Sequence, residues 1–452
     1  MVHSGMLSRV TTLILVLIFV LPACSGKRNN PVGMFDSGTG GLTVLEAFLT
    51  LDEFNNITGE RGADGILDFS KEDFVFLADQ VNMPYGIYNS QGKGELLKEL
   101  VVNDARFLAS DPFNSKIIVI ACNTATANAL TEVAGYLDSE REGTKVIGVI
   151  NAAAEELFLA SGGERLSAVG IMATEGTIAS GGYERTINEI FSAGGAVVPV
   201  VVNQAGSGFA ESVDLERDYT DLSAFETREN YRGPRMGEGD GFINLKLLGA
   251  YNFDNSGNAL LTKVENGKIV DIQLNTSGNY ARYHLVSLLE KFRTMESGVK
   301  LENIILGCTH YPYLLDTMKL MITELRDFKE GNVYPYRDLL ADEVRFIDPS
   351  KYVAIETYEA LKESGLLSQR GNNGSLKTFI SLPNPALPAD KLDPRGGFTF
   401  EFKYGRELEG LRETYVIKEL SKDLIPAESL ERIEKRLPAT FGIMKLSDKN
   451  DL

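Results

Sequence analysis

The stretch KIIVIACNTATANAL, residues 116–130, decides the expected fold because it joins a buried strand to a helix through a cysteine. Residues 117–121 are apolar and mostly β-branched, which is typical of a strand buried in a parallel sheet. Cys122 then precedes an alanine-rich segment that favours a helix. A second stretch, NIILGCTHYPYLL at 303–315, repeats this layout around Cys308. These two strand–cysteine–helix units predict an α/β fold with mostly parallel sheets.

Two further predicted strands also end in polar residues. VGMFDSGTGG at 32–41 continues from its apolar start into Asp36 and Ser37, and VGIMATEGT at 169–177 continues into Thr174. In open α/β sheets, binding and reacting groups lie beyond the carboxyl ends of the strands. We therefore expect these polar residues and the two cysteines to form one site.

A cysteine at the start of a helix lies near unpaired backbone N–H groups and the positive end of the helix dipole. In that position the pKa of the thiol falls below its usual value of about 8.5, so a thiolate forms closer to neutral pH. The same N–H groups, with nearby polar side chains, could hold the carboxylate of a substrate. These side chains are Ser37, Asn123, Thr124, Thr174 and Thr309.

Two other interpretations of the cysteines were weighed. A single cysteine after a strand is commonly a packing residue, but two in matching positions, one followed by Thr309-His310, favour chemistry. Cys308 and His310 could instead be metal ligands. The remaining histidines, His3 and His284, belong to no paired motif, so no metal site is expected. No dinucleotide fingerprint or P-loop is present either.

The composition excludes several classes of protein. The chain has 452 residues, with 45 Lys and Arg against 63 Asp and Glu, which gives a net charge of −18. Its length predicts two or three domains, and a hydrophobic content of 43% excludes wholesale disorder. The acidic excess argues against a nucleic-acid partner and against a polybasic membrane patch. Three cysteines are too few for a disulfide framework in a chain of this length.

The N-terminus resembles an export signal. The apolar run VTTLILVLIFVL at 10–21 follows Arg9 and is shorter than the roughly 20 residues that span a bilayer. LPAC at 21–24 resembles the lipobox of bacterial lipoproteins, which implies lipid attachment at Cys24. We expect residues 1–30 to be a signal, lipobox and tether that place an exported protein on the periplasmic side of a membrane. The alternative is an apolar N-terminal helix with an incidental cysteine, in which case the protein is cytoplasmic.

Four motifs carry a resemblance to a known family. They occur in the order VGMFDSGTGGLTVL (32–45), MPYG (83–86), VIACNTATANAL (119–130) and ILGCTHYPYLL (305–315). In this order they resemble the signature segments of bacterial glutamate racemases, which belong to the cofactor-independent aspartate/glutamate racemase superfamily. The resemblance covers approximately residues 31–210 and 280–365, with interruptions.

The resemblance implies that the protein interconverts L- and D-glutamate, supplies D-glutamate for peptidoglycan and needs no cofactor. One base cannot easily reach both faces of the α-carbon, so two opposed acid/base groups are required. By resemblance these are Cys122 and Cys308, with Asp36 assisting the proton handling of Cys122 and His310 that of Cys308. The implied partner is a small amino acid, and a homodimer is compatible with the sequence. The positions that match substrate-binding residues of the family are Asp36, Ser37, Tyr85, Gly86, Asn123, Thr124, Thr309 and His310.

The resemblance also implies two similar lobes, each with a mostly parallel sheet flanked by helices, and an active site in the cleft between them. Residues 31–148 and 316–452 are expected to form a discontinuous first lobe with a C-terminal extension. Residues 149–315 are expected to form the second lobe, with an insertion at about 213–280.

Smaller features within these regions carry their own expectations. Residues 260–272 predict a β-hairpin around Glu265-Asn266-Gly267, and residues 398–402 alternate like an edge strand. Residues 429–436 predict a solvated helix.

Some positions depart from the family pattern. Asn82 stands where members commonly have an arginine, and Asn151 follows Ile150 where a proline is frequent. Residues 204–209 lie in a region that normally closes the pocket.

Two alternatives stay open, because peptidoglycan precursors are made in the cytoplasm whereas the leader predicts export. One is an exported racemase of aspartate or another amino acid, and the other is a non-catalytic amino-acid-binding lipoprotein.

Overall fold

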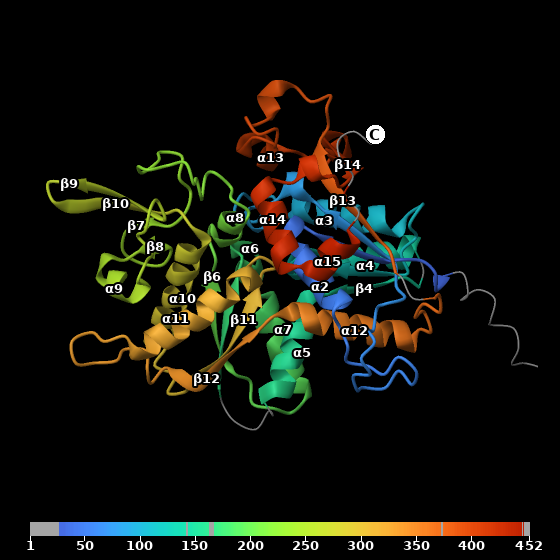
Figure 1. Ribbon diagram of the computed structural model, residues 1–452, viewed down its shortest axis with the longest axis horizontal. Helices are drawn as coiled ribbons and strands as arrows, with labels where there is room; N and C mark the ends of the chain where they lie inside the picture. The colour runs from blue at the N-terminus through green and yellow to red at the C-terminus, as the bar shows by residue number, and fades with distance from the viewer. Residues whose placement is uncertain (1–26, 142, 162–166, 372–373, 445, 447–452) are drawn as a thin grey trace, which may run out of the picture.

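The computed structural model of the protein describes residues 27–141, 143–161, 167–371, 374–444 and 446. The expected signal and lipobox, including Cys24, lie outside the described residues. Within the described ranges, no helix combines the length and the apolar character needed to cross a membrane. Two lobes lie side by side, one mainly blue, cyan and red and the other mainly green, yellow and orange (Figure 1).

The first lobe is built on a six-stranded sheet. Its strands follow the order β14 (Tyr415–Glu419), β13 (Leu376–Pro383), β2 (Phe74–Ala78), β1 (Val32–Asp36), β3 (Ile117–Ile120) and β4 (Lys145–Gly148). All neighbours are parallel except β14, which runs antiparallel to β13. Helix α2 (Leu42–Leu49) covers one face of this sheet, and α3 (Gly94–Ala109) and α4 (Asn123–Glu140) cover the other.

The second lobe is built on four parallel strands. Their order is β12 (Leu340–Ile347), β11 (Leu301–Gly307), β5 (Ala168–Ala173) and β6 (Val200–Ala205). One face packs against α10 (Ser277–Thr294) and α11 (Leu315–Asp327), and the other packs against α5 (Val149–Ser161) and α7 (Gly182–Ala193). The predicted α/β fold with two mostly parallel sheets is confirmed.

The chain leaves the second lobe later than expected. The sequence predicts a return to the first lobe after residue 315, but β12 pairs with β11 in the second sheet. β12 pairs in parallel with β11, the strand that ends before Cys308, so the chain completes the second sheet before it returns. The chain then enters α12 (Pro349–Glu363), which packs against both α5 and α2.

Both sheets direct the carboxyl ends of their central strands towards the junction of the lobes. Asp36 is the last residue of β1, and Cys122 follows β3 by two residues. In the other lobe, Thr174 follows β5 and Cys308 follows β11. Within each lobe the parallel topology collects the polar motifs of two segments at one edge, and the junction of the lobes brings the two edges together.

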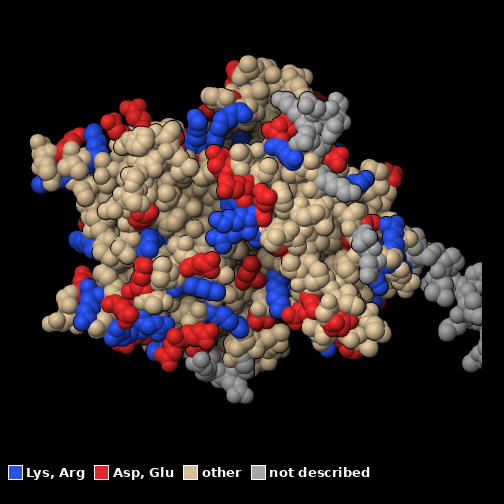
Figure 2. Space-filling model, in the orientation of Figure 1, with Lys and Arg blue, Asp and Glu red and all other residues tan. Residues whose placement is uncertain are grey.

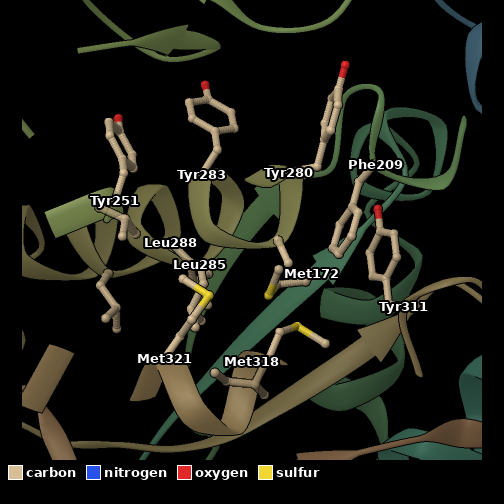
Figure 3. Close-up of a cluster of buried hydrophobic side chains, with 14 of the residues drawn as sticks. Met172, Phe209, Tyr251, Tyr280, Tyr283, Leu285, Leu288, Tyr311, Met318 and Met321 are labelled. Carbon is tan, nitrogen blue, oxygen red and sulfur yellow. The ribbon is translucent and has the colours of Figure 1, made fainter. Parts of the chain in front are cut away.

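The insertion contributes to the core of the second lobe. It contains β7 (Arg235–Met236), β8 (Phe242–Ile243), η4 (Leu245–Leu247), α9 (Leu248–Tyr251) and the predicted hairpin, β9 (Leu260–Glu265) with β10 (Lys268–Leu274). The Tyr251 ring packs beside Tyr283 of α10 in the apolar cluster of Figure 3, with centroids 5.8 Å apart. Tyr231 is also buried, and its hydroxyl accepts the Leu274 N–H at 3.1 Å. Much of the insertion is thus structural.

The C-terminal extension adds β13 and β14 to the first sheet, with one short α-helix between these strands and two after them. These are α13 (Phe400–Gly405), α14 (Ala427–Arg436) and α15 (Pro438–Ile443). The edge strand expected at 398–402 is wrong, because Thr399 caps a helix there and its hydroxyl accepts the Phe402 N–H at 3.3 Å. The helix expected at 429–436 is present, but it is only partly solvated, since Ser429 and Ile433 are buried.

Charged side chains of both signs are mixed on the surface. On the face shown in Figure 2, Lys and Arg lie among Asp and Glu. Ion pairs join some of these neighbours, for example Arg61 and Glu359 at 2.7 Å. Since exposed pairs are screened by water and salt, they contribute little to stability.

Candidate active site

One cavity at the junction of the lobes brings together the predicted site residues. Its volume is about 30 Å³, which is room for roughly two water molecules, so an amino acid can enter only if wall residues move. All ten predicted catalytic and substrate-binding residues of the described chain line it: Asp36, Ser37, Tyr85, Gly86, Cys122, Asn123, Thr124, Cys308, Thr309 and His310. Met83, Pro84, Thr174, Ala210 and Glu211 complete the wall.

Cys122 forms the N-cap of α4, as the sequence predicts. Its Sγ accepts the Ala125 N–H at 3.5 Å. Burial nevertheless raises the pKa of the Cys122 thiol well above its usual value, and the nearby Asp36 carboxylate raises it further. The expectation of a lowered pKa is therefore wrong for Cys122, because loss of water outweighs one long hydrogen bond from the helix. Cys122 is a neutral thiol in the closed cavity.

Asp36 is held by the glycine-rich turn that follows β1. Its Oδ2 accepts the N–H groups of Gly41 at 2.8 Å and Gly38 at 3.3 Å, and the Thr309 hydroxyl lies 3.5 Å away. Burial raises the pKa of Asp36 in spite of these contacts. Its Oδ1 is buried and has no hydrogen-bond partner among the described residues. This oxygen is available to a proton or to the ammonium group of a ligand.

Cys308 has a different set of neighbours. Its Sγ lies 3.5 Å from Nδ1 of His310, and Nε2 of His310 lies 2.9 Å from Oδ2 of Asp214. Burial alone would lower the pKa of His310, but Asp214 outweighs it and holds this pKa well above its usual value. His310 is therefore an imidazolium that can donate to both Asp214 and the Cys308 sulfur.

Asp214 also contacts a residue of the C-terminal extension. Its Oδ1 lies 3.1 Å from Nη2 of Arg432. Burial would raise the pKa of Asp214, but His310 and Arg432 more than compensate and hold it below its usual value. Cys308 and His310, considered above as metal ligands, thus belong to a hydrogen-bonded chain. Across the described residues, no group of three or more His, Cys, Asp or Glu side chains could hold a metal ion.

Hydroxyl groups line the wall where the lobes meet. The Thr124 Oγ1 of α4 lies 2.7 Å from Thr174 Oγ1 and 3.2 Å from Thr177 Oγ1, both of the second lobe. Beside them, the Tyr183 hydroxyl donates to Asn123 Oδ1 at 2.5 Å. Rotatable hydroxyls and the N–H groups at the start of α4 can bind a carboxylate without a basic residue.

Tyr85 lines the cavity, but its hydroxyl is already engaged. It lies 2.5 Å from Asp79 Oδ2 and 2.8 Å from Asp104 Oδ2. One phenol proton cannot serve both carboxyl groups, and burial raises the pKa of Asp104 well above its usual value. Asp104 therefore carries a proton of its own. Only the ring and backbone of Tyr85 are free to face a ligand.

The C-terminal extension also compensates for the departure at Asn82. Nη2 of Arg406 donates to Asn82 Oδ1 at 2.6 Å and to the Tyr88 hydroxyl at 3.1 Å. Asn82 in turn donates to Asp79 Oδ1 at 2.8 Å. A guanidinium group from a distant segment thus binds the Asn82 side chain.

Three functional candidates were missed by the sequence analysis: Glu211, Asp214 and Arg432. Burial raises the pKa of Glu211 to about 8, so at neutral pH its carboxyl group is mostly protonated and can donate a hydrogen bond within the cavity. A weak signal existed for Glu211 and Asp214, which follow the glycine-rich turn at 206–208. None existed for Arg432, which is one of several charged residues in α14.

Sequence comparison finds relatives that match most of the chain. A glutamate racemase from Levilactobacillus brevis is 25% identical over 360 residues, covering 78% of this chain and 87% of that protein. One from Clostridium novyi is 25% identical over 354 residues, covering 78% of this chain and 92% of that protein. A glutamate racemase from Streptococcus agalactiae is 34% identical over 197 residues, which are 42% of this chain and 62% of that protein. No protein-family model matches the chain.

Solved structures with a related arrangement include two glutamate racemases. The isoform RacE1 from Bacillus anthracis has a TM-score of 0.45 and 22% identity, covering 78% of this chain and 89% of its own. The enzyme from Francisella tularensis, solved in complex with D-glutamate, has a TM-score of 0.44 and 19% identity, covering 84% of this chain and 95% of its own. The chain is thus similar to glutamate racemases over most of its length, and its four ordered motifs converge on one cavity.

Proposed function

We propose that the protein interconverts L- and D-glutamate by a cofactor-independent reaction with two cysteine acid/bases. The observation that carries this proposal is the placement of Cys122 and Cys308 in one cavity, each on a different lobe and each with its own acid/base neighbour. A binding protein needs neither thiol. The names of the sequence relatives support glutamate as the substrate.

In the proposed reaction, one sulfur removes the α-hydrogen as a proton while the other returns a proton to the opposite face. The neighbours of the two sulfurs suit this division of labour. Cys122 is a neutral thiol and can act as the acid, whereas Cys308, whose Sγ lies 3.5 Å from Nδ1 of His310, can act as the base. After one turnover the roles are exchanged, which lets the opposite enantiomer react.

The cavity can also stabilise the carbanion that forms between the two proton transfers. The hydroxyls of Thr124 and Thr174 and the N–H groups at the start of α4 would hold the α-carboxylate. The free Oδ1 of Asp36 would hold the α-ammonium group, which also brings a positive charge towards Cys122. Protonated Glu211 would donate to a carboxylate oxygen of the substrate. Exclusion of water from so small a cavity strengthens each of these contacts.

The proposal is tested by following glutamate in deuterated water at neutral pH, where Glu211 is mostly protonated. We expect each enantiomer to yield the other, with deuterium at the α-carbon of the product and hydrogen retained in unreacted substrate. This pattern distinguishes two bases from one, because a single base would return solvent deuterium to the substrate itself. Chiral chromatography with mass spectrometry measures it. Parallel reactions with aspartate test the alternative substrate, and tight binding by calorimetry without any interconversion would rule out catalysis.

We also propose that Cys24 anchors the mature protein to a membrane, and that the product feeds peptidoglycan synthesis. The lipobox-like LPAC segment at 21–24 supports the membrane anchor. A clickable fatty-acid probe should label the full chain in bacterial cells, and Cys24→Ala should lose the label while Cys122→Ala keeps it. Labelling that survives Cys24→Ala would contradict the anchor. The peptidoglycan role is tested by complementing a bacterial strain that requires D-glutamate. If the strain grows with the leaderless chain but not with the exported chain, the peptidoglycan role belongs to the cytoplasm.

A further inference from the structure

Arg432 connects the C-terminal extension to the catalytic cavity. It lies on α14, and its side chain is only 19% exposed although its neighbours in sequence are charged. Nη2 lies 3.1 Å from Asp214 Oδ1, and Nη1 donates to the backbone oxygen of Val213. The guanidinium carbon also lies 5.1 Å from the centre of the Tyr313 ring. These three contacts fix both the position and the plane of the guanidinium group.

The contact with Asp214 continues directly to a catalytic sulfur. Oδ1 of Asp214 faces Arg432 while Oδ2 faces Nε2 of His310 at 2.9 Å, so both carboxylate oxygens have a cationic partner. Nδ1 on the other side of the imidazole ring lies 3.5 Å from Cys308 Sγ. Asp214 and His310 are almost fully buried, with side chains 7% and 3% exposed. Contacts therefore run without a break from Arg432 on α14 through Asp214 and His310 to the sulfur of Cys308, the proposed catalytic base on the second lobe.

We propose that Arg432 is a positioning residue for Cys308, so that the C-terminal extension completes one half of the catalytic machinery. This inference rests on the proposed function. Arg432 holds one oxygen of Asp214, which leaves the other oxygen to orient His310 with its Nδ1 towards the sulfur. If Arg432 is removed, the carboxylate can rotate about its Cβ–Cγ bond, and the imidazole loses its fixed direction.

The structure makes this effect specific to one cysteine. Cys122 lies on the other lobe, where its Sγ accepts the Ala125 N–H and its neighbour Asp36 accepts the Gly41 N–H. Loss of Arg432 should therefore weaken proton transfer at Cys308 and leave transfer at Cys122 unchanged. A general loss of stability would affect both cysteines alike.

The matched variants are Arg432→Met, Arg432→Lys and Arg436→Met. Methionine keeps the apolar stem of the side chain and removes its charge. Arg436 lies on the same helix but forms only an exposed pair with Asp316 at 3.5 Å, so it controls for changes in helix charge. We expect Arg432→Met to lower kcat/KM about tenfold. This loss is a part of the roughly 10²–10⁴-fold rate increase that a positioned acid/base supplies. Arg432→Lys should recover part of this loss, and Arg436→Met should match the unaltered protein.

Isotope effects show which cysteine is affected. Enantiomers have equal free energies, so kcat/KM must fall equally in both directions and cannot reveal the site. With α-deuterated substrates, however, Arg432→Met should raise the isotope effect for the enantiomer that Cys308 deprotonates and lower it for the other. Cys122→Ser should give the opposite asymmetry. Equal isotope effects for both enantiomers, unchanged from the parent protein, would overturn the inference.

A second measurement needs no substrate and separates failure of the inference from failure of the proposed function. Because the thiolate is the nucleophile, iodoacetamide at neutral pH should alkylate Cys308 several-fold more slowly in Arg432→Met, while Cys122 keeps its rate. Peptide mass spectrometry follows both cysteines in the same sample. If Arg432→Ala folds, added methylguanidinium should restore the rate at which its Cys308 is alkylated. If Arg432→Ala does not fold, Arg432→Lys replaces it as the test of recovery. Unchanged alkylation of Cys308, or equal changes at both cysteines, would refute the role of Arg432 even if the protein does not act on glutamate.

Discussion

Alanine at Cys308 is expected to abolish interconversion of L- and D-glutamate, and alanine at Cys122 is expected to do the same. Each variant leaves the cavity with one cysteine thiol, so a proton can be removed from or returned to only one face of the α-carbon. A positioned acid/base increases the rate roughly 10²–10⁴-fold, and no other thiol of the described residues lines the cavity. The loss should therefore reach at least about 10²-fold in each case, measured by chiral chromatography.

The two alanine variants should differ in what they retain. Each still has one base, so each should exchange the α-hydrogen of a single enantiomer with deuterated water without inverting it. Cys122→Ala and Cys308→Ala should act on opposite enantiomers. Circular dichroism during heating provides the control for folding, since both cysteines are nearly buried. Normal racemisation by either variant would show that the two-base assignment is wrong.

Alanine at Gly40 is expected to inactivate the enzyme although Gly40 has no functional group. A Cβ atom at this position would lie 2.5 Å from Cε1 and 2.8 Å from Nδ1 of the His310 ring. The ring cannot withdraw easily, because Asp214 holds its Nε2 at 2.9 Å. Overpacking of this kind costs about 1–3 kcal/mol in the free energy of unfolding. A displacement of about 1 Å at a catalytic group can lower the rate about 10²-fold.

Gly135→Ala provides the matched control. Gly135 lies within α4, and a Cβ atom there would meet no heavy atom within 4 Å. Alanine should therefore stabilise the helix by about 0.5–1 kcal/mol and leave kcat/KM unchanged. Thermal melts and initial rates on both variants make the comparison. If Gly40→Ala retained the parent rate, the close packing of the glycine-rich turn against His310 could not be required for catalysis.

The sequence by itself determined the fold class and the membership of the cavity. Strand–cysteine–helix units such as 116–130 are local patterns, and their apolar runs and helix starts depend on neighbouring residues only. Because the parallel strands of one sheet present their carboxyl ends on the same edge, the polar residues after the strands of each lobe had to lie close together. The four motifs named the ten residues that line the cavity, whereas tertiary packing decided that the edges of the two sheets meet.

The tertiary structure alone decided the partners and protonation states of these residues. Arg432 reaches Asp214 across 218 positions of the chain, and Arg406 reaches Asn82 across 324, separations over which no local pattern carries information. The pKa of Cys122 is raised rather than lowered, because it depends on how completely water is excluded by both lobes together. Strand ends can therefore be predicted from spacing, whereas charge balance and desolvation exist only once distant segments have packed.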